Sequence, residues 1–360
     1  MCGRFAQGMD LNDILNEFNQ AISNTNDESV ENNVPDSSRV SQWTPSCNIA
    51  PTNTALMVYM AEPQEGVTQK YVFEPSKFGL VPSWAKPTDP TPVNKGKQNE
   101  GEKYSRELGK HESKYFNCRR ESLAEHRAVW SSCKKHRCVV PIQGYFEWLK
   151  TKNEKTPYFV HSQTAPLIFL AGFFSHNYNY KDNFNVKDEC LSTFTVITAP
   201  AEKLDKYDLS WLHTRKTLVI KPGSAAWFKW LDSKREWDDS LIDEVLNTKT
   251  NEAYASIEAY QVSNDVGNPS NKSENILKKV NGKKGVSDFF KKHVKQEGEN
   301  TKGSSIKQEG EDVESSSFKQ EPSEDGKEMK VKTESSSQPS SKRSKHGRDD
   351  SSKKVKIEGD

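Results

Sequence analysis

The first residues that could do chemistry stand at the start of the chain, which reads MCGRFA. Removal of Met1 would leave Cys2 with a free α-amine and a thiol on adjacent carbons. An α-amine titrates near ~7.7–8.0 and a lysine near ~10.4, so much of this amine is nucleophilic at neutral pH. It would form an imine with an aldehyde, and the thiol would then close a five-membered thiazolidine ring on the same carbon. The sequence thus predicts capture of an aldehyde as a stable covalent adduct.

Two other interpretations of Cys2 stay open. Free cysteines are mostly small buried hydrophobic residues, so Cys2 could simply begin a strand. A start of MCG is also typical of N-terminal-nucleophile amidotransferases, in which the thiol attacks glutamine. The His-Arg-Gly-Pro and Asn-Gly-Glu runs that accompany the cysteine in those enzymes do not occur in this sequence. The aldehyde reaction is therefore favoured.

The composition of the whole chain predicts a folded part with polar sequence added to it. Its 360 residues include 52 Lys and Arg against 51 Asp and Glu, and a net charge of +1 indicates no class of partner. Only 32% of the residues are hydrophobic, which is low for a wholly globular chain. Six cysteines in a chain of this size are typical of reduced thiols, and neither a membrane span nor a signal peptide is present. We expect a soluble protein of the cytosol or nucleus.

The elements that must position Cys2 are predicted to be mainly strands. Residues 137–149, 167–174 and 191–199 are rich in β-branched and aromatic residues, which favour strands. Apolar residues at helical spacing predict helices in 10–18 and 238–246. Because no regular alternation of strands and helices appears, we predict an α+β fold around a mainly antiparallel, barrel-like sheet with a few flanking helices.

A change of composition near residue 265 predicts two parts. Residues 1–265 form the folded domain, in which the segments near 23–39 and 86–114 are interpreted as surface loops too polar to pack. Residues 266–360 are rich in Lys, Glu and Ser and nearly lack aromatic residues, so they predict a disordered regulatory tail.

A short pattern of an apolar residue, lysine, any residue and glutamate recurs five times in the tail. The pattern resembles the acceptor sequence of the small modifier SUMO. We therefore predict modification at Lys295, Lys307, Lys319, Lys332 and Lys356.

Two further features of the tail suggest a nuclear protein with a replication partner. Basic clusters within 340–356 have the spacing of a nuclear-import signal, although a solvated charge run is the alternative. The segment 285–292 resembles a sliding-clamp-binding motif through Val286, Phe289 and Phe290, with Lys283 where such motifs usually have glutamine.

The run CKKHRC places Cys133, His136 and Cys138 close together, residue types that can bind a metal ion. Their spacing is poor for a tetrahedral site, and no second pair of ligands follows. We expect no metal and no other cofactor.

Six motifs appear in the order and style of the SRAP family, the SOS-response-associated peptidase-like proteins whose members sense abasic sites in DNA. They cover most of residues 1–265 and read MCGRFA, CNIAPT (47–52), FGLVPSWAK (78–86), NCRRES (117–122), PIQGYFEW (141–148) and LHTRKTLVI (212–220). The resemblance implies that the processed N-terminal cysteine, here Cys2, crosslinks to the ring-opened aldehyde of an abasic site in single-stranded DNA. It also implies lyase-like or thiol-peptidase activity, and it leaves open whether Met1 is removed autocatalytically.

The same resemblance implies roles for other residues. Glu147 resembles the acid/base residue that senses the abasic sugar, and His213 resembles the residue that assists proton transfer and ring opening. A carboxylate and an imidazole are the usual pair for such chemistry. Asn117 resembles the amide that holds the Cys2 end. The expected DNA contacts are arginines for phosphates and two apolar residues for bases, namely Arg4, Arg119, Arg120, Arg215, Trp84 and Pro51.

Two departures from the family pattern stand close to these motifs. Cys118 occupies a position where a small residue is common, and we expect it to crowd the pocket. Lys216-Thr217 follow where Met-Pro is frequent, and we expect them to alter the wall beside His213. Two alternative functions stay open: an N-terminal-cysteine thiol peptidase or amidotransferase, and a non-covalent reader of modified DNA bases.

Overall fold

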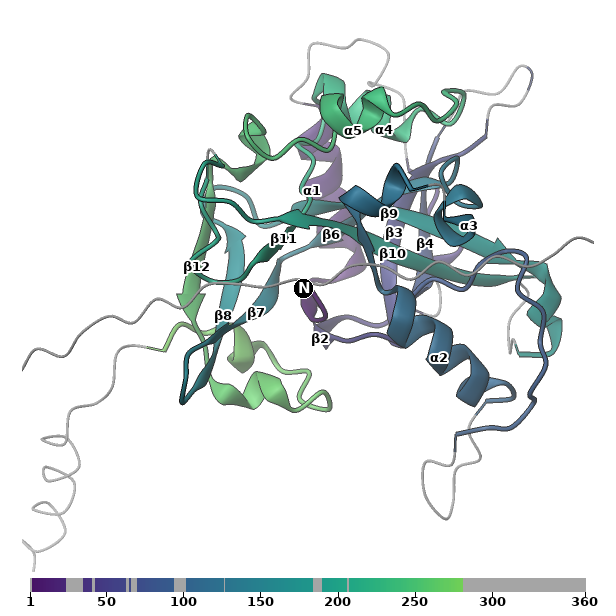
Figure 1. The fold of residues 1–360 in the computed structure, drawn as a ribbon, viewed down its shortest axis with the longest axis horizontal. Coiled ribbons are helices and arrows are strands. Elements are labelled where there is room, and N and C mark those ends of the chain that lie inside the picture. The colour runs from purple at the N-terminus through teal and green to yellow at the C-terminus, as the bar shows by residue number, and fades with distance from the viewer. Residues whose placement is uncertain are drawn as a thin grey trace, which may run out of the picture. The chain divides into compact units, whose positions relative to one another are not determined.

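Twelve strands and five α-helices make up the described part of the chain (Figure 1). The structure is a computed structural model, and it describes residues 2–23, 35–40, 43–62, 65, 70–93, 102–125, 127–183, 190–205 and 207–280. The strands are β1 (Phe5–Gln7), β2 (Ser46–Ile49), β3 (Thr54–Met60), β4 (Tyr71–Phe78), β5 (Asn117–Arg119), β6 (Arg137–Ile142), β7 (Gly144–Lys150), β8 (Lys155–Ser162), β9 (Ile168–Asn177), β10 (Leu191–Pro200), β11 (Arg215–Thr217) and β12 (Ile257–Gln261). The helices are α1 (Leu11–Ser23), α2 (Ser105–Tyr115), α3 (Ala128–Ser131), α4 (Ala225–Leu231) and α5 (Ser240–Glu244).

Five of the strands form a closed barrel. They follow one another in the order β10, β4, β3, β6 and β9, and β9 pairs back to β10. Every pairing in this ring is antiparallel except that of β4 with β10. β10 reads LSTFTVITAP and consists largely of β-branched and aromatic residues, which suit a strand paired on both sides. The predicted α+β fold with a mainly antiparallel, barrel-like sheet is confirmed.

A second sheet carries the start of the chain. Its order is β12, β8, β7, β1 and β2, and all of its pairings are antiparallel. β1 therefore lies between β7 and β2, with Phe5 opposite Tyr145 on one side and Ile49 on the other. The residues directly before β1, including Cys2, are thus fixed relative to β7.

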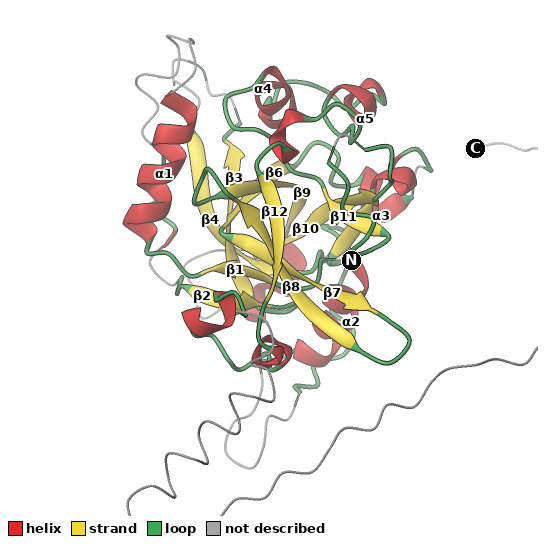
Figure 2. Ribbon diagram, turned by 90° about the vertical axis from the view of Figure 1, so that its left-hand side faces the viewer, coloured by secondary structure: helices red, strands yellow, loops and turns green. Residues whose placement is uncertain are grey.

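Apolar side chains pack on both faces of the barrel strands. One cluster takes residues from all five barrel strands and also includes Cys2 and Phe5, whose ring centroid lies 5.1 Å from that of Phe78. A second cluster packs under α1, α4 and α5 (Figure 2). α1 contributes Ile14, Phe18 and Ile22, which recur every four residues and so share one helix face. The helix predicted in 10–18 is confirmed.

The interpretation of 86–114 as a loop too polar to pack is wrong for its second half, which forms most of α2. The carboxylate of Glu107 is buried and accepts hydrogen bonds from the backbone N–H groups of Thr88 and Asp89 and from the Tyr180 hydroxyl. The segment therefore packs through hydrogen bonds to a buried charge, which a count of apolar residues does not detect. In the other insertion, residues 24–34 lie outside the described residues.

The folded part continues beyond the predicted boundary at residue 265. Val266 and Ile276 are buried in a cluster with Phe146 and Phe159 of the second sheet. The proposed SUMO sites and the clamp motif lie in 281–360, outside the described residues. Within the described ranges, no helix is both long enough and apolar enough to span a bilayer.

Candidate active site

Cys2 is held in place by the strand that follows it and by an amide from a distant element. The residue is 2% exposed, and its carbonyl accepts a hydrogen bond of 2.9 Å from Nδ2 of Asn117, the first residue of β5. Its thiol donates a long hydrogen bond of 3.8 Å to the carbonyl of Arg4. The Cys2 end is therefore fixed at the junction of the barrel and the second sheet.

The environment of the Cys2 thiol disfavours the thiolate. Burial raises its pKa to about 12, and the negative charge of Glu147 adds to that effect. Catalytic cysteines of peptidases show the opposite change, since their thiol pKa is lowered by cationic neighbours. At neutral pH the thiol is protonated and needs a base when its sulfur forms a bond.

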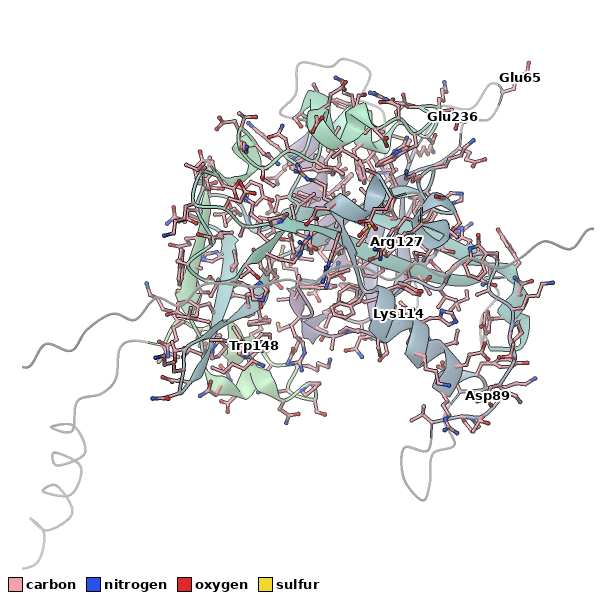
Figure 3. All side chains as sticks on the ribbon, in the orientation of Figure 1. Glu65, Asp89, Lys114, Arg127, Trp148 and Glu236 are labelled. Carbon is pink, nitrogen blue, oxygen red and sulfur yellow. The ribbon has the colours of Figure 1, made fainter. Side chains whose placement is uncertain are left out.

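Glu147 and His213 come together from elements far apart in the sequence. Glu147 lies on β7, only 6% exposed, and its Oε1 is 3.8 Å from Nε2 of His213 in the β10–β11 connection. The backbone N–H of Trp148, which is labelled in Figure 3, lies 3.3 Å from the same carboxylate oxygen. A carboxylate and an imidazole thus meet beside Cys2.

The surroundings of His213 define its tautomer. The backbone N–H of Arg215 donates to Nδ1 at 3.0 Å, so the proton of a neutral ring lies on Nε2, facing Glu147. Burial lowers the pKa of His213, and the Glu147 charge opposes this effect. The imidazole is therefore neutral near pH 7 and carries a proton that it can donate.

Sequence reasoning missed Tyr145, which precedes Glu147 by two residues and so projects from the same face of β7. Its burial raises the pKa of the phenol, with smaller effects from Tyr254, Cys2 and Glu147. The GYFEW motif contains both Tyr145 and Glu147, so the motif was the sequence feature that could have pointed to Tyr145.

Three of the four arginines predicted to bind phosphates donate hydrogen bonds to protein acceptors, namely Arg4, Arg215 and Arg120. Nη1 of Arg4 donates to Asn48 Oδ1 and to the carbonyl of Val266, at 3.1 and 2.7 Å. Arg215 makes a bidentate pair with the carboxylate of Glu121, at 2.8 and 3.0 Å. These contacts position the chain around the site.

The other two arginines lie together at the end of β5. Nη1 of Arg120 donates to the carbonyl of Leu246 at 3.1 Å, whereas Arg119 is exposed. Of these four arginines, only Arg119 has an exposed side chain.

The two apolar residues predicted to contact bases lie in loops. Trp84 is 56% exposed, and the loop that carries it is fixed by the Asn177 amide, which donates to the carbonyls of Pro82 and Ala85 at 2.7 and 2.9 Å. Pro51 is partly exposed in the turn between β2 and β3. The structure therefore brings Cys2, Asn117, Glu147 and His213 together and places Trp84 and Pro51 on separate loops.

Of the two departures from the family pattern, Cys118 points away from the reacting groups, whereas Thr217 interacts with the phenol of Tyr145, which shares a cluster with Cys2. Cys118 is fully buried and packs in the cluster under the helices, whereas Cys2 belongs to the other cluster, so the expected crowding is wrong. Successive side chains of a strand face opposite ways, which explains why Asn117 reaches Cys2 and Cys118 does not. The Lys216 side chain is buried, with Nζ 3.1 Å from Oδ2 of Asp205.

The sequence CKKHRC shows no arrangement of metal ligands. The Cys133 thiol donates to the carbonyls of Val129 and Trp130, at 3.5 and 3.4 Å. Within the described ranges, no three His, Cys, Asp or Glu side chains are grouped so that they could hold a metal ion.

Comparison with known proteins gives one family. The model of the family described as SOS response associated peptidase (SRAP) matches residues 1–269. The abasic site processing protein YMR114C of Saccharomyces cerevisiae is 31% identical over 312 residues, which cover 83% of this chain and 72% of that protein. The abasic site processing protein YedK of Escherichia coli is 25% identical over 288 residues, which cover 78% of this chain and 100% of that protein.

A solved structure supports the same fold. A crystal structure of a protein from Bacteroides thetaiotaomicron superposes with a TM-score of 0.55 at 15% identity, covering 78% of this chain and 100% of that one.

Proposed function

Because this chain belongs to the SRAP family, we propose that it processes abasic sites in single-stranded DNA by forming a covalent crosslink through Cys2. The names of its relatives in yeast and bacteria, abasic site processing proteins, support the substrate class. The observation that carries the reaction is the meeting of an anchored Cys2 with the Glu147–His213 pair, whose Oε1 and Nε2 are 3.8 Å apart.

The proposed reaction joins the two nucleophiles of Cys2 to one sugar carbon. After Met1 is removed, the amine attacks the C1′ aldehyde of the ring-opened abasic sugar and forms a carbinolamine, which loses water to give an imine. The thiol then adds across the C=N bond: sulfur bonds to C1′, and the thiol proton ends on nitrogen. The product is a thiazolidine, and one water molecule is released overall without any oxidant or reductant.

Glu147 and His213 divide the proton transfers between them. In ring opening, the carboxylate takes the proton of the 1′-hydroxyl while Nε2–H of His213 protonates the ring oxygen as the C1′–O4′ bond breaks. Glu147 passes its proton to the vacated Nε2 of His213, so both groups end the step in the protonation state in which they began it. In ring closure of the thiazolidine, Glu147 receives the S–H proton and relays it to nitrogen. The thiol requires this help because burial raises its pKa to about 12.

A thiol peptidase or amidotransferase is less well supported. Such an enzyme needs a reactive thiolate, whereas the pKa of the Cys2 thiol is raised. A non-covalent reader of modified bases would have no use for a nucleophile beside an acid/base pair.

The test is mass spectrometry of the protein after incubation with an abasic single-stranded oligonucleotide. The expected product survives heating and has the summed mass of the Met1-lacking protein and the oligonucleotide minus one water. Cys2→Ala should give no such product. Cys2→Ser keeps the amine and should give only an imine that requires borohydride reduction to be isolated. A heat-stable adduct on the alanine variant would reject the mechanism.

We also propose that the protein is nuclear and that its tail is modified by SUMO and contacts a sliding clamp. The five repeated acceptor patterns and the basic clusters of 340–356 support this proposal, which concerns residues outside the described ranges. Replacing the five acceptor lysines by arginine should abolish modification in a reconstituted SUMO reaction. Unchanged modification would reject the acceptor assignment, and unchanged clamp binding after Phe289→Ala and Phe290→Ala would reject the clamp contact.

A further inference from the structure

Trp211 is an exposed indole next to the candidate active site that the proposed reaction does not use. All eight tryptophans of the chain lie among the described residues, and only two of them are exposed, Trp84 at 56% and Trp211 at 47%. Building on the proposed function, we propose that Trp211 and Tyr158 form a stacking surface for the nucleobase next to the abasic nucleotide.

Trp211 belongs to the connection 201–214 between β10 and β11, which packs on the face of the second sheet that carries Glu147. Leu209 and Leu212 of this connection are buried in the cluster that contains Cys2 and Tyr145. Trp211 lies between these two anchors and two residues before His213. The indole is therefore part of the same turn that supplies the imidazole.

The indole rests on a side chain that is a direct neighbour of Glu147. The ring centroids of Trp211 and Tyr158 are 5.3 Å apart at an interplanar angle of 82°. Tyr158 is the residue of β8 directly opposite Glu147 of β7, so both side chains project from the same face with Cβ atoms about 4.5–5.5 Å apart. Trp211 thus contacts a side chain that is the cross-strand neighbour of Glu147, which places the indole beside the proposed reacting groups.

Contacts on both sides of Trp211 anchor the described part of the connection, so the indole is in place before DNA binds. The buried Asp205 carboxylate accepts from the Thr248 hydroxyl at 2.9 Å and pairs with Lys216 Nζ at 3.1 Å. At the base of the connection, the N–H of Ala201 donates to the carbonyl of Thr214 at 2.9 Å. A preorganised aromatic ring loses little conformational freedom when a base stacks on it.

The charged residue nearest to Trp211 along the turn is an acid, Asp208, and Lys203 and Lys216 lie close enough to lower the pKa of its carboxyl. Asp208 is exposed, and its carboxylate accepts from the backbone N–H of Ser210 at 2.7 Å, one residue before Trp211. A carboxylate at this position repels the DNA backbone, whereas stacking on an aromatic ring requires no cation.

The test removes the ring on the protein and the base on the DNA in separate steps. Single-stranded oligonucleotides carry a tetrahydrofuran abasic analogue, which has no aldehyde and therefore reports binding without crosslinking. In two further oligonucleotides, the base on the 5′ or the 3′ side is also removed. The proteins are the wild type, Trp211→Ala, Trp211→Phe and the control Tyr178→Ala, whose ring is 56% exposed elsewhere.

Trp211→Ala should weaken binding about 5- to 150-fold when both neighbouring bases are present, whereas Trp211→Phe and Tyr178→Ala should bind nearly as well as wild type. When the base that contacts the indole is removed, the wild type and Trp211→Ala should bind equally, and the side on which this happens identifies that base. The proposal would be overturned if Trp211→Ala lost the same affinity, relative to wild type, for all three oligonucleotides, or lost no affinity for any of them. Failure of the crosslinking reaction would show separately, as the absence of a Cys2-dependent adduct on aldehyde-bearing DNA.

Discussion

Glu147 is the residue on which the proposed proton transfers depend. Its carboxylate is buried, lies 3.8 Å from His213 Nε2 and faces the Cys2 thiol closely enough to affect its pKa. A buried carboxylate 3.8 Å from an imidazole nitrogen and near a thiol could accept a proton from either the sugar or the sulfur in the proposed reaction. The proposed proton transfers depend on β7, which places Glu147, and on the β10–β11 connection, which places His213.

Glu147→Gln should slow crosslinking by about 10²–10⁴-fold, because the amide keeps the shape of the side chain but cannot accept a proton. Binding to tetrahydrofuran-containing DNA should change little. Single-turnover rates measured by gel shift check the first effect and fluorescence anisotropy checks the second. The matched control is Glu154→Gln, in the exposed turn between β7 and β8. A variant that crosslinks at the wild-type rate would exclude Glu147 from the chemistry.

Alkylation of Cys2 should be slow in the folded protein. Its thiol pKa is raised from 9.0 to about 12, so the thiolate fraction at pH 8 is roughly 1000-fold lower than in the unfolded chain. Iodoacetamide labelling followed by peptide mass spectrometry, with and without urea, measures the difference. Equal rates in the two states would mean that the thiol is activated, as the peptidase alternative requires.

At the scale of elements, α2 contains an unusual buried acid. Glu112 packs against the end of β4, where the φ of Gly79 is +126° and a Cβ would lie 2.4 Å from the Cα of Glu112. Burial raises the pKa of Glu112 to about 7, opposed by Lys77, and among the described residues its Oε1 has no hydrogen-bond partner. The helix therefore carries a carboxyl group that is costly to ionise.

The stability of the protein should fall as the pH rises through about 7. The folded state binds the Glu112 proton more tightly than the unfolded state, whose pKa is 4.5, so the stabilisation is complete below pH 4.5 and is lost above 7. Glu112→Gln removes the titration, so urea unfolding should find it more stable than wild type at pH 8, by up to about 3 kcal/mol, and similar at pH 5. The same difference at both pH values would contradict this account.

At the scale of the whole molecule, residues beyond 265 are part of the folded structure. Val266 and Ile276 are buried against the second sheet, and the carbonyl of Val266 accepts a hydrogen bond of 2.7 Å from Arg4, two residues after Cys2. The hydroxyl of Tyr260 on β12 also donates to the carbonyl of Leu277 at 2.7 Å. The segment therefore supports the strand that positions the nucleophile.

A chain that ends after Val280 should have the same free energy of unfolding and the same crosslinking rate as the full chain. A chain that ends after residue 265 should lose about 3–6 kcal/mol of stability. The loss corresponds to the burial of two large apolar side chains, Val266 and Ile276, that the shorter chain no longer contains, at about 1.5–3 kcal/mol each. Urea titrations of both truncations compared with the full chain measure it. If the shorter truncation is as stable as the longer one, the segment is not required for the fold.

Residue types and local patterns were enough to suggest the proposed chemistry and to predict the class of the fold. The types of Cys2, Glu147 and His213 and the motifs around them define a nucleophile, an acid/base group and an imidazole, and β-branched runs identify β9 and β10 as strands. These features are local, because reactivity depends on residue type and strand formation depends largely on nearby residues.

The contacts of the other side chains became known only from the tertiary structure. Arg4 and Arg215 are bound to protein acceptors, Lys216 is buried against Asp205, and Trp211 reaches Glu147 through Tyr158. α2 likewise packs through the hydrogen bonds of Glu107 although its sequence is polar. The physical reason is that these contacts depend on strand register and on burial between segments far apart in the chain, which local composition does not encode.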